Sequence, residues 1–196
     1  MVTDINQLDP AAYYTYADYL TWKFSERVEL LRGKLLRMSA APSTRHQDVA
    51  TALTGIIWQH LRKSKSCKVY SAPFDVRLPV SLKEGKTDTV VQPDITVVCN
   101  LEILDLQGCN GAPDLVVEVL SPGNTKREMR DKLELYREAK VKEYWLIDPV
   151  SDWLIIYRLD KKGAYVGSTF YTEDSIVSSS VLPNLEIDLQ EIFNND

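Results

Sequence analysis

Residues 112–149 read APDLVVEVLSPGNTKREMRDKLELYREAKVKEYWLIDP, and this stretch decides the fold that we expect. It starts with an apolar, β-branched run, turns at Ser121-Pro122-Gly123-Asn124, continues as a charged helical segment and ends in a second apolar run. A strand, a helix and a second strand in this order predict a crossover unit with two neighbouring parallel strands. The stretch therefore indicates a mixed sheet with helices packed on it.

Glu118 is the residue in this stretch that most needs an explanation. The strand around it is apolar on both faces, so we expect it to be buried. A buried carboxylate is costly unless it is paired or bound to a cation. Asp114 lies on the same face of the strand, because alternate residues share a face. It directly follows Pro113 and is expected to have a structural role.

Asp94 is the expected partner of Glu118. It lies in a second buried strand, VVQPDITVVC at residues 90–99. If the two strands are neighbours, the two carboxylates meet on one side of the sheet, where they repel each other and raise one pKa. A divalent cation removes this conflict, and hard oxygen ligands suit Mg²⁺ or Mn²⁺. Such an ion can activate a water molecule and neutralise charge on a phosphate.

Lys132 adds a possible cation from the helix. It lies at the edge of the inward stripe formed by Met129, Leu133 and Tyr136. A lysine there can extend along the packed face and present its ammonium at the end of the sheet. In a phosphodiesterase it would orient the attacking water or offset charge in the transition state. A lysine at such a position is also often an ordinary surface residue.

The remaining chain predicts further helices and strands around this unit. We expect a β-hairpin around Gly33, in RVELLRGKLLRMS, because glycine accepts the positive φ of a tight turn. Helices are expected at 11–22, 45–63 and near 189–193, strands at 68–78, 153–158 and 165–171, and a linker at 100–112. With 196 residues, 44% of them hydrophobic, the chain suits one α/β domain over residues 1–196.

The net charge of −5 speaks against a nucleic-acid partner, but its distribution is uneven. Residues 44–68 contain five bases and one acid, residues 121–142 contain seven bases and four acids, and residues 148–196 contain nine acids and three bases. The basic middle predicts either a locally positive groove or ordinary solvated helix faces.

The sequence favours a cytoplasmic protein. No apolar run is long enough to span a bilayer, so no membrane association is expected. The first residues, MVTDINQLDP, carry acids where a signal peptide needs bases. Cys67, Cys99 and Cys109 are odd in number and form no CxxC pair, which suggests neither a disulfide framework nor a zinc site.

Four motifs together resemble the Uma2 family, formerly a domain of unknown function, which is classed with the PD-(D/E)XK restriction-endonuclease-like superfamily. They are PDITVV at 93–98, APDLVVEVLSP at 112–122, K-x3-Y at 132–136 and EYWLIDP at 143–149. The hairpin ELLRGKLLRMSAAP at 29–42 and His46 also resemble the N-terminal block of the family. The resemblance covers most of the chain.

The resemblance implies a restriction-endonuclease-like αβββαβ core of the α/β (α+β) class, with a mixed central sheet and an N-terminal β-hairpin. It implies that Asp94 and Glu118 bind Mg²⁺ or Mn²⁺. The E-x-K motif of the superfamily would place a lysine at position 120, where this chain has Leu120, and Lys132 is the matching position for a lysine moved to the helix. The possible supporting residues are Glu29, His46 and Gln47.

Three functions use this set of residues. The leading hypothesis is a Mg²⁺-dependent DNA endonuclease, dimeric because cutting both strands favours two sites, with Asp94, Glu118 and Lys132 as catalytic residues. The alternative is a catalytically inactive nuclease fold that serves as a nucleic-acid-binding or interaction module. A third is a metal-dependent phosphohydrolase acting on a small molecule, which would show no salt-dependent affinity for DNA.

Overall fold

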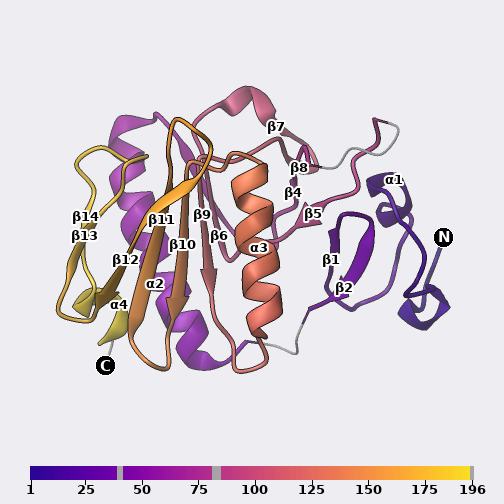
Figure 1. Cartoon of the computed structure of the whole chain (residues 1–196), viewed down its shortest axis with the longest axis horizontal. Helices are drawn as coiled ribbons and strands as arrows, with labels where there is room; N and C mark the ends of the chain where they lie inside the picture. The colour runs from indigo at the N-terminus through magenta and orange to yellow at the C-terminus, as the bar shows by residue number, and fades with distance from the viewer. Residues whose placement is uncertain (39–41, 81–84, 195–196) are drawn as a thin grey trace.

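A six-stranded mixed sheet forms the centre of the molecule (Figure 1). The computed structural model of the chain describes residues 1–38, 42–80 and 85–194. The strand order in this sheet is β12-β11-β10-β9-β6-β3. The strands are β3 (Lys68–Ser71), β6 (Ile95–Val98), β9 (Leu115–Val119), β10 (Glu143–Asp148), β11 (Trp153–Leu159) and β12 (Tyr165–Thr172).

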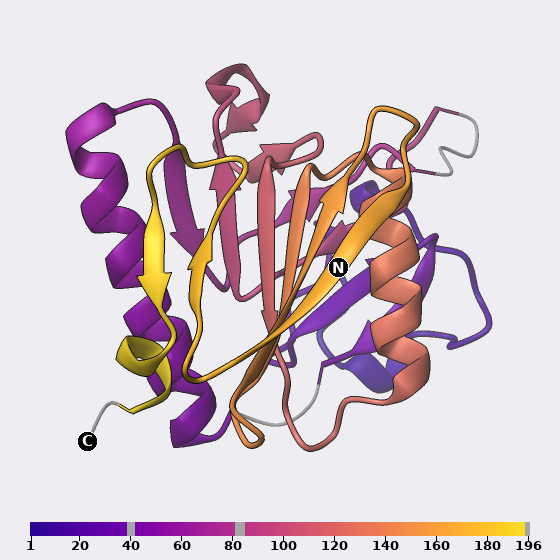
Figure 2. The same ribbon diagram turned by 60° about the vertical axis from the view of Figure 1, so that its left-hand side comes forward.

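The predicted crossover unit is confirmed. Strands β9 and β10 are parallel, and α3 (Lys126–Glu138) connects them. Helix α3 begins with a capping box between Thr125 and Glu128, which satisfies backbone donors at its first turn. The helix predicted at 45–63 is α2 (Thr44–Ser64), which lies on the opposite face of the sheet (Figure 2). Two apolar cores therefore form, one under each helix.

A second six-stranded sheet, in the order β2-β1-β5-β4-β8-β7, lies beside the first. It contains the predicted hairpin and short strands from three other segments: β1 (Val28–Leu31), β2 (Lys34–Arg37), β4 (Val76–Arg77), β5 (Val90–Val91), β7 (Leu104–Asp105) and β8 (Gly108–Asn110). Residues 100–112 were predicted to be a linker, and this prediction was wrong because they supply β7 and β8.

Two predicted strands are each divided between the two sheets. The strand expected at 68–78 breaks at the cis peptide Ala72-Pro73 into β3 and β4. The strand expected at 90–99 breaks at Gln92-Pro93-Asp94 into β5 and β6. Asp94 consequently stands where the chain leaves one sheet and enters the other.

The hairpin turn between β1 and β2 requires its glycine. Arg32 and Gly33 both have positive φ, at 53° and 75°. A Cβ atom on Gly33 would lie 2.3 Å from the ring of Tyr13. A side chain at this position would therefore meet both the backbone strain and the tyrosine ring.

The two ends of the chain differ from the prediction. The helix expected at 11–22 is only the short α1 (Tyr16–Tyr19), preceded by a 3₁₀ turn, η1 (Ile5–Gln7). The capping box of Thr15 and Asp18 starts α1 late, and the neighbouring aromatic rings pack on Ile5 instead of continuing a helix. The tail forms α4 (Gln190–Phe193) as expected, together with an unpredicted pair of strands, β13 (Ile176–Ser178) and β14 (Glu186–Asp188).

A 3₁₀ turn, η2 (Leu101–Ile103), precedes β7. Within the described ranges, no helix combines the length and the apolar character that crossing a bilayer requires.

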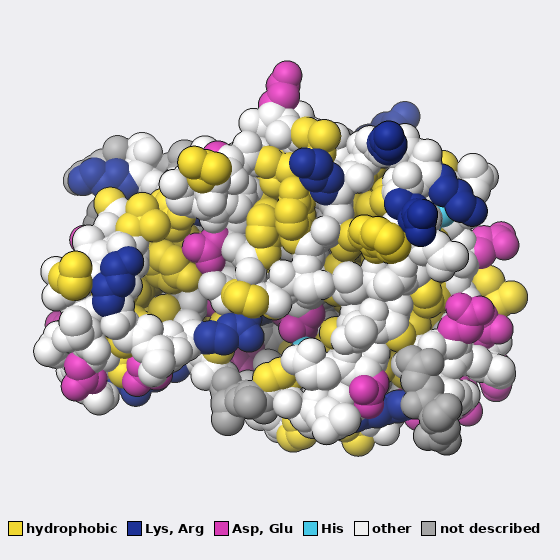
Figure 3. Space-filling view, turned by 180° about the vertical axis from the view of Figure 1, so that it is seen from behind, with side chains coloured by type: hydrophobic (Ala, Val, Ile, Leu, Met, Phe, Trp, Pro, Cys, Tyr) yellow, Lys and Arg dark blue, Asp and Glu magenta, His cyan; other side chains and the backbone are white. Residues whose placement is uncertain are grey.

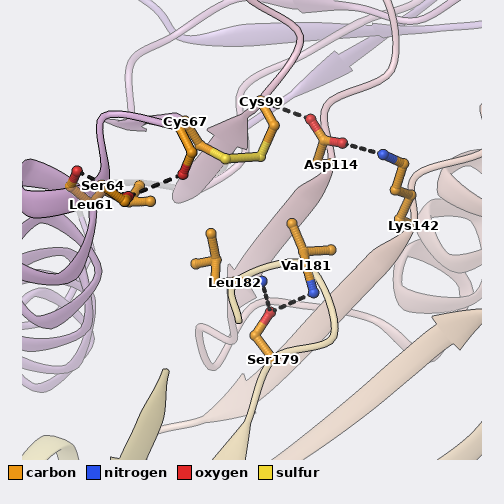
Figure 4. The surroundings of a disulfide bond; sticks show 10 residues. Leu61, Ser64, Cys67, Cys99, Asp114, Lys142, Ser179, Val181 and Leu182 are labelled. Atoms are coloured by element: carbon orange, nitrogen blue, oxygen red, sulfur yellow. Dashed lines mark hydrogen bonds and ion pairs between the residues drawn. A yellow bond between two sulfur atoms is a disulfide. The ribbon is translucent and has the colours of Figure 1, made fainter. Parts of the chain in front are cut away.

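Cys67 and Cys99 form a disulfide bond (Figure 4), so the expectation that the cysteines form none was wrong. Lys68 of β3 faces Val98 of β6 across an antiparallel pair. Cys67 directly precedes Lys68, and Cys99 directly follows Val98. The register therefore brings their Cα atoms within 4.0 Å of each other. The cysteine count could not reveal this pairing because it depends on which strands are neighbours.

Asp114 has the structural role that its position predicted. Its Oδ2 accepts a hydrogen bond from the backbone N–H of Cys99 at 2.7 Å, and its Oδ1 lies 2.6 Å from Nζ of Lys142 (Figure 4). The carboxylate thus ties the end of β6 to the start of β10.

Reduction of the disulfide should lower the free energy of unfolding. The bond closes a loop with a sequence separation of 32 residues. The chain-entropy account gives about 3–4 kcal/mol for a loop of this length. Urea unfolding with and without reductant measures the change, and the Cys67→Ser/Cys99→Ser variant, which reductant cannot affect, is the control. Equal stability of the wild type in both conditions would contradict the pairing.

Candidate active site

Asp94 and Glu118 lie side by side, as predicted. Strands β6 and β9 are antiparallel neighbours, with Thr96 opposite Val116, so the same register places Asp94 beside Glu118. Oδ2 of Asp94 accepts a hydrogen bond from the backbone N–H of Val119 at 2.8 Å. This bond fixes the carboxylate of Asp94 at the end of β9.

Lys132 reaches these acids from α3. Its Nζ lies 2.8 Å from Oε1 of Glu118 and 3.2 Å from Glu29, and its side chain is only 14% exposed. Burial alone would lower the pKa of Lys132, but the charges of Glu118 and Glu29 outweigh burial and hold the pKa above its ordinary value. The ammonium is therefore protonated at neutral pH.

Glu118 is the most perturbed acid of the site. Its Oε1 accepts hydrogen bonds from Nζ of Lys132 and, at 2.5 Å, from the hydroxyl of Tyr136. Burial raises the pKa of Glu118 to about 7, against the opposing effect of Lys132 and with further raising by the charges of Glu29 and Asp94. A cation that approached this carboxyl group would lower its pKa and favour its charged form.

Glu29 joins the site from the other sheet. It is 1% exposed, and its Oε1 accepts a hydrogen bond from the backbone N–H of Gln92 at 2.8 Å. Its second contact is with Lys132, so one lysine bridges an acid from each sheet. The family resemblance had implied that Glu29 is a possible supporting residue, and the structure brings it to the other charged residues of the site.

His46 reaches the site, whereas the neighbouring Gln47 does not. His46 is buried in the first turn of α2, with Nε2 3.4 Å from Oδ2 of Asp94. Burial alone would lower the pKa of His46, but the hydrogen bond and charge of Asp94, with smaller contributions from Val119 and Glu118, raise it. Gln47 is exposed and does not line the hollow that contains the other five candidates.

The site opens to solvent through a hollow of about 280 Å³. Near the lower centre of Figure 3, acidic and histidine side chains lie below the surrounding surface. Arg27 and Arg37 line this hollow from the hairpin side, and Gly123 and Asn124 line it from the loop before α3. Positive side chains along the same hollow as the acids favour an anionic ligand.

The donor set fits a magnesium-like ion held by two carboxylates. Oδ1 of Asp94 and Oε2 of Glu118 accept no hydrogen bond from any described residue, so both remain available. Over residues 1–38, 42–80 and 85–194, no group of three or more His, Cys, Asp or Glu side chains is arranged as a metal site. Mg²⁺ is commonly held by one or two carboxylates with water and substrate phosphate completing its shell, so two available oxygens are enough.

Two residues complete the site beyond those that the sequence had singled out as catalytic. Tyr136 was expected only as part of the packed stripe, yet its hydroxyl binds Glu118. The backbone N–H of Gln92 donates a hydrogen bond to Glu29. Gln92 directly precedes Pro93-Asp94, and this position in the sequence could have indicated that Gln92 lies at the site. Leu120 is half-buried and lines the hollow, so the cation of the site comes from α3 instead of β9.

Comparison with known proteins agrees with this arrangement. The model of the Uma2 family, described as "Putative restriction endonuclease", matches residues 16–190. The chain belongs to the Uma2 family. That match includes all the residues assigned to the site above.

Individual relatives are distant in sequence but similar over nearly their whole length. The uncharacterized protein slr1290 of Synechocystis is 22% identical over 175 residues, which cover 88% of each chain. A crystal structure from Anabaena variabilis, described as "a putative nuclease belonging to DUF820", superposes with a TM-score of 0.72 at 19% identity. The superposition covers 92% of this chain and 98% of that one. This likeness confirms the predicted fold class.

Removal of the Lys132 cation should destabilise the protein. Lys132→Met leaves Glu29 and Glu118 buried without their positive partner, which typically costs about 3–5 kcal/mol. Arg127→Met is the matched control on the same helix, because the side chain of Arg127 is 84% exposed and its ion pair with Asp131 contributes at most about 1 kcal/mol. Urea unfolding measures both changes. An equal loss in the two variants would contradict a buried role for Lys132.

Proposed function

We propose that this Uma2 protein is a Mg²⁺- or Mn²⁺-dependent endonuclease that hydrolyses phosphodiester bonds of DNA. One observation carries the proposal. Asp94 at the junction of β5 and β6, Glu118 of β9 and Lys132 of α3 meet at one hollow, with the Lys132 ammonium 2.8 Å from Glu118. The nuclease descriptions of the family and of the structural relative support the same reaction class.

Asp94 and Glu118 would hold the metal ion through the two oxygens that no described residue binds. A bound Mg²⁺ supplies neutralisation of the phosphate charge and a more acidic water molecule. The hydrogen bonds from Val119 to Asp94 and from Tyr136 to Glu118 keep both carboxylates in place before the substrate arrives. His46 further orients Asp94 from the start of α2.

Lys132 acts as a donor in this proposal. Its raised pKa keeps the ammonium protonated, so it cannot remove a proton from water. It can instead donate hydrogen bonds that orient the attacking water and offset the negative charge that develops on the phosphate. Hydrolysis adds the water oxygen to phosphorus and breaks one P–O ester bond, and the leaving oxygen takes up a proton. Glu29 positions Lys132 for this role.

DNA is the proposed substrate, and a homodimer is the proposed assembly. A duplex has two strands to cut, and this chain offers one set of Asp94, Glu118 and Lys132, so two copies would supply one site for each strand. The arginines at the entrance, Arg27 and Arg37, would contact the phosphates beside the scissile bond.

An inactive nucleic-acid-binding or interaction module is the second candidate. The observation that favours it is that Lys132 already forms ion pairs with Glu118 and Glu29, while the described residues contain no set of three metal-binding side chains. A permanently paired site of this kind could keep the fold without cutting.

Cleavage of supercoiled plasmid DNA in Mg²⁺ or Mn²⁺ tests the proposed activity. Glu118→Gln, Asp94→Asn and Lys132→Ala should each lower the rate by about a hundredfold or more, because each removes a preorganised charge from the reacting centre. Asp114→Asn is the control, since it makes the same carboxylate-to-amide change on the same strand face but at the structural position. Cleavage that survives all three site variants would rule out these catalytic residues.

Calorimetric titration with Mn²⁺ separates the two candidates. The wild type should bind the ion, and Asp94→Asn and Glu118→Gln should each weaken binding at least about tenfold, since a tenfold change needs only about 1.4 kcal/mol. Gln47→Ala should bind as the wild type does, because Gln47 is exposed and lies outside the hollow. Failure of the wild type to bind either Mn²⁺ or Mg²⁺ would instead support the inactive module.

A further inference from the structure

A second polar surface lies at the opposite end of α2 from the active site. Trp58, Arg62 and Lys65 follow one another at helical spacing, and Lys68 begins the edge strand β3 beside them. We call these four residues the basic–aromatic patch. Together with Tyr70 they line a shallow hollow of about 370 Å³, which Leu101 borders. The proposed mechanism uses none of them.

The three cations of the patch are exposed and lack acidic partners. Arg62, Lys65 and Lys68 form no ion pair with any residue in the described part of the chain. The chain as a whole carries a net charge of −5, so this is a local positive surface on an acidic protein. Charges alone would indicate an ordinary solvated helix end, but an exposed aromatic residue, Trp58, lies beside Arg62.

Trp58 is an exposed aromatic platform. It is 55% exposed, whereas Trp145 is fully buried. The guanidinium carbon of Arg62 lies 5.2 Å from the centre of the Trp58 ring, so a positive group covers one part of the ring and solvent covers another. Aromatic rings beside cations are the combination with which proteins bind single-stranded nucleic acid, because every base has a face that can stack.

The dimensions of the patch suit a few nucleotides. Trp58 of α2 and Lys65, the residue that caps the end of α2, are seven positions apart, which corresponds to about 10 Å along the helix axis. At about 3.4 Å per stacked nucleotide, this length spans roughly three of them. Glu191 of α4 lines the adjacent depression on the far side of Trp58 and Arg62, so an acid limits the patch in that direction.

The patch and the active site share one face of the molecule. In Figure 3 the hollow of the active site lies near the lower centre, and lysine and arginine side chains gather at the upper right, over the end of α2. His46 and Trp58 lie on the same helix twelve residues apart, or about 18 Å. That distance equals roughly five stacked nucleotides. A strand bound at the patch could therefore extend to the active site.

We propose that the basic–aromatic patch is a binding site for single-stranded nucleic acid. One base stacks on Trp58, and the phosphates on either side contact Arg62, Lys65 and Lys68. The site is separate from Asp94, Glu118 and Lys132, and it rests on the proposed function only in taking nucleic acid as its ligand.

Fluorescence anisotropy of a labelled oligothymidylate tests this site, with about 15 nucleotides to cover single-strand sites of ordinary size. The titration is made in EDTA, so that no metal-dependent cleavage occurs. Trp58→Leu should weaken binding about five- to hundredfold, because it removes the stacking surface, and Trp58→Phe should recover part of the loss. Quenching of tryptophan fluorescence on binding should be largely lost in Trp58→Leu.

Charge variants test the phosphate contacts. Lys65→Gln/Lys68→Gln should reduce the slope of log affinity against log salt by about 1.4, which corresponds to two released phosphate contacts on a single strand. Lys161→Gln/Lys162→Gln is the matched control, since it removes the same charge from the turn between β11 and β12, at the opposite edge of the sheet. This control should bind oligothymidylate as the wild type does.

Three results would overturn the proposal. The first is that Trp58→Leu binds oligothymidylate as tightly as the wild type does. The second is that the two double lysine variants lose the same amount of affinity. The third is that heparin, or a duplex of the same length, displaces the labelled oligothymidylate at a lower concentration than unlabelled oligothymidylate does. Circular dichroism of each variant confirms that the fold is retained, and the Trp58→Phe comparison holds even if Trp58→Leu unfolds. Because the titration contains no metal ion, a wild type that binds oligothymidylate but does not cleave DNA in Mg²⁺ or Mn²⁺ would count against the proposed function alone.

Discussion

The ammonium of Lys132, held between Glu118 and Glu29, is the interaction on which the site depends. It joins the hairpin strand β1, the central strand β9 and the helix α3, and it offsets the negative charge that these elements bury together. Three carboxylates, those of Glu29, Asp94 and Glu118, surround one permanent cation. Burial raises the pKa of Glu118, and the charges of Glu29 and Asp94 raise it further. In the proposed function an additional divalent cation would relieve the excess of negative charge, so the same cluster would both join the two sheets and hold a metal ion.

The fold creates this cluster at the junction of its two sheets. The chain passes from β5 into β6 at Asp94, and the hairpin that carries Glu29 belongs to the second sheet alone. The three acids therefore come from β1, from the junction of β5 and β6, and from β9. Helix α2 begins at the same junction, which brings His46 to Asp94, and it ends at the basic–aromatic patch. A single helix thus links the proposed site of cleavage to the proposed site of strand binding.

Local periodicity explains which parts of this arrangement the sequence could predict. Alternation along two apolar strands placed Asp94 and Glu118 on one face, and the helical stripe of α3 placed Lys132 at its edge. The burial of Glu29 depends on β1 meeting β5 through the single pair Leu30 and Val90, which no local pattern encodes. The disulfide likewise depends on the register of two strands far apart in sequence. The helix predicted at 11–22 was wrong because the aromatic rings of this segment pack on one another and on the hairpin, and do not form one face of a helix.

A crystal soaked in Mn²⁺, with the metal located by its anomalous scattering, tests the central claim most directly. Our account predicts one strong peak beside the carboxylates of Asp94 and Glu118, which would hold the ion. The same soak of Glu118→Gln should leave that position without a peak. A peak elsewhere in the wild type, or a Lys132 that still fills the space between the acids with no metal bound, would contradict the account.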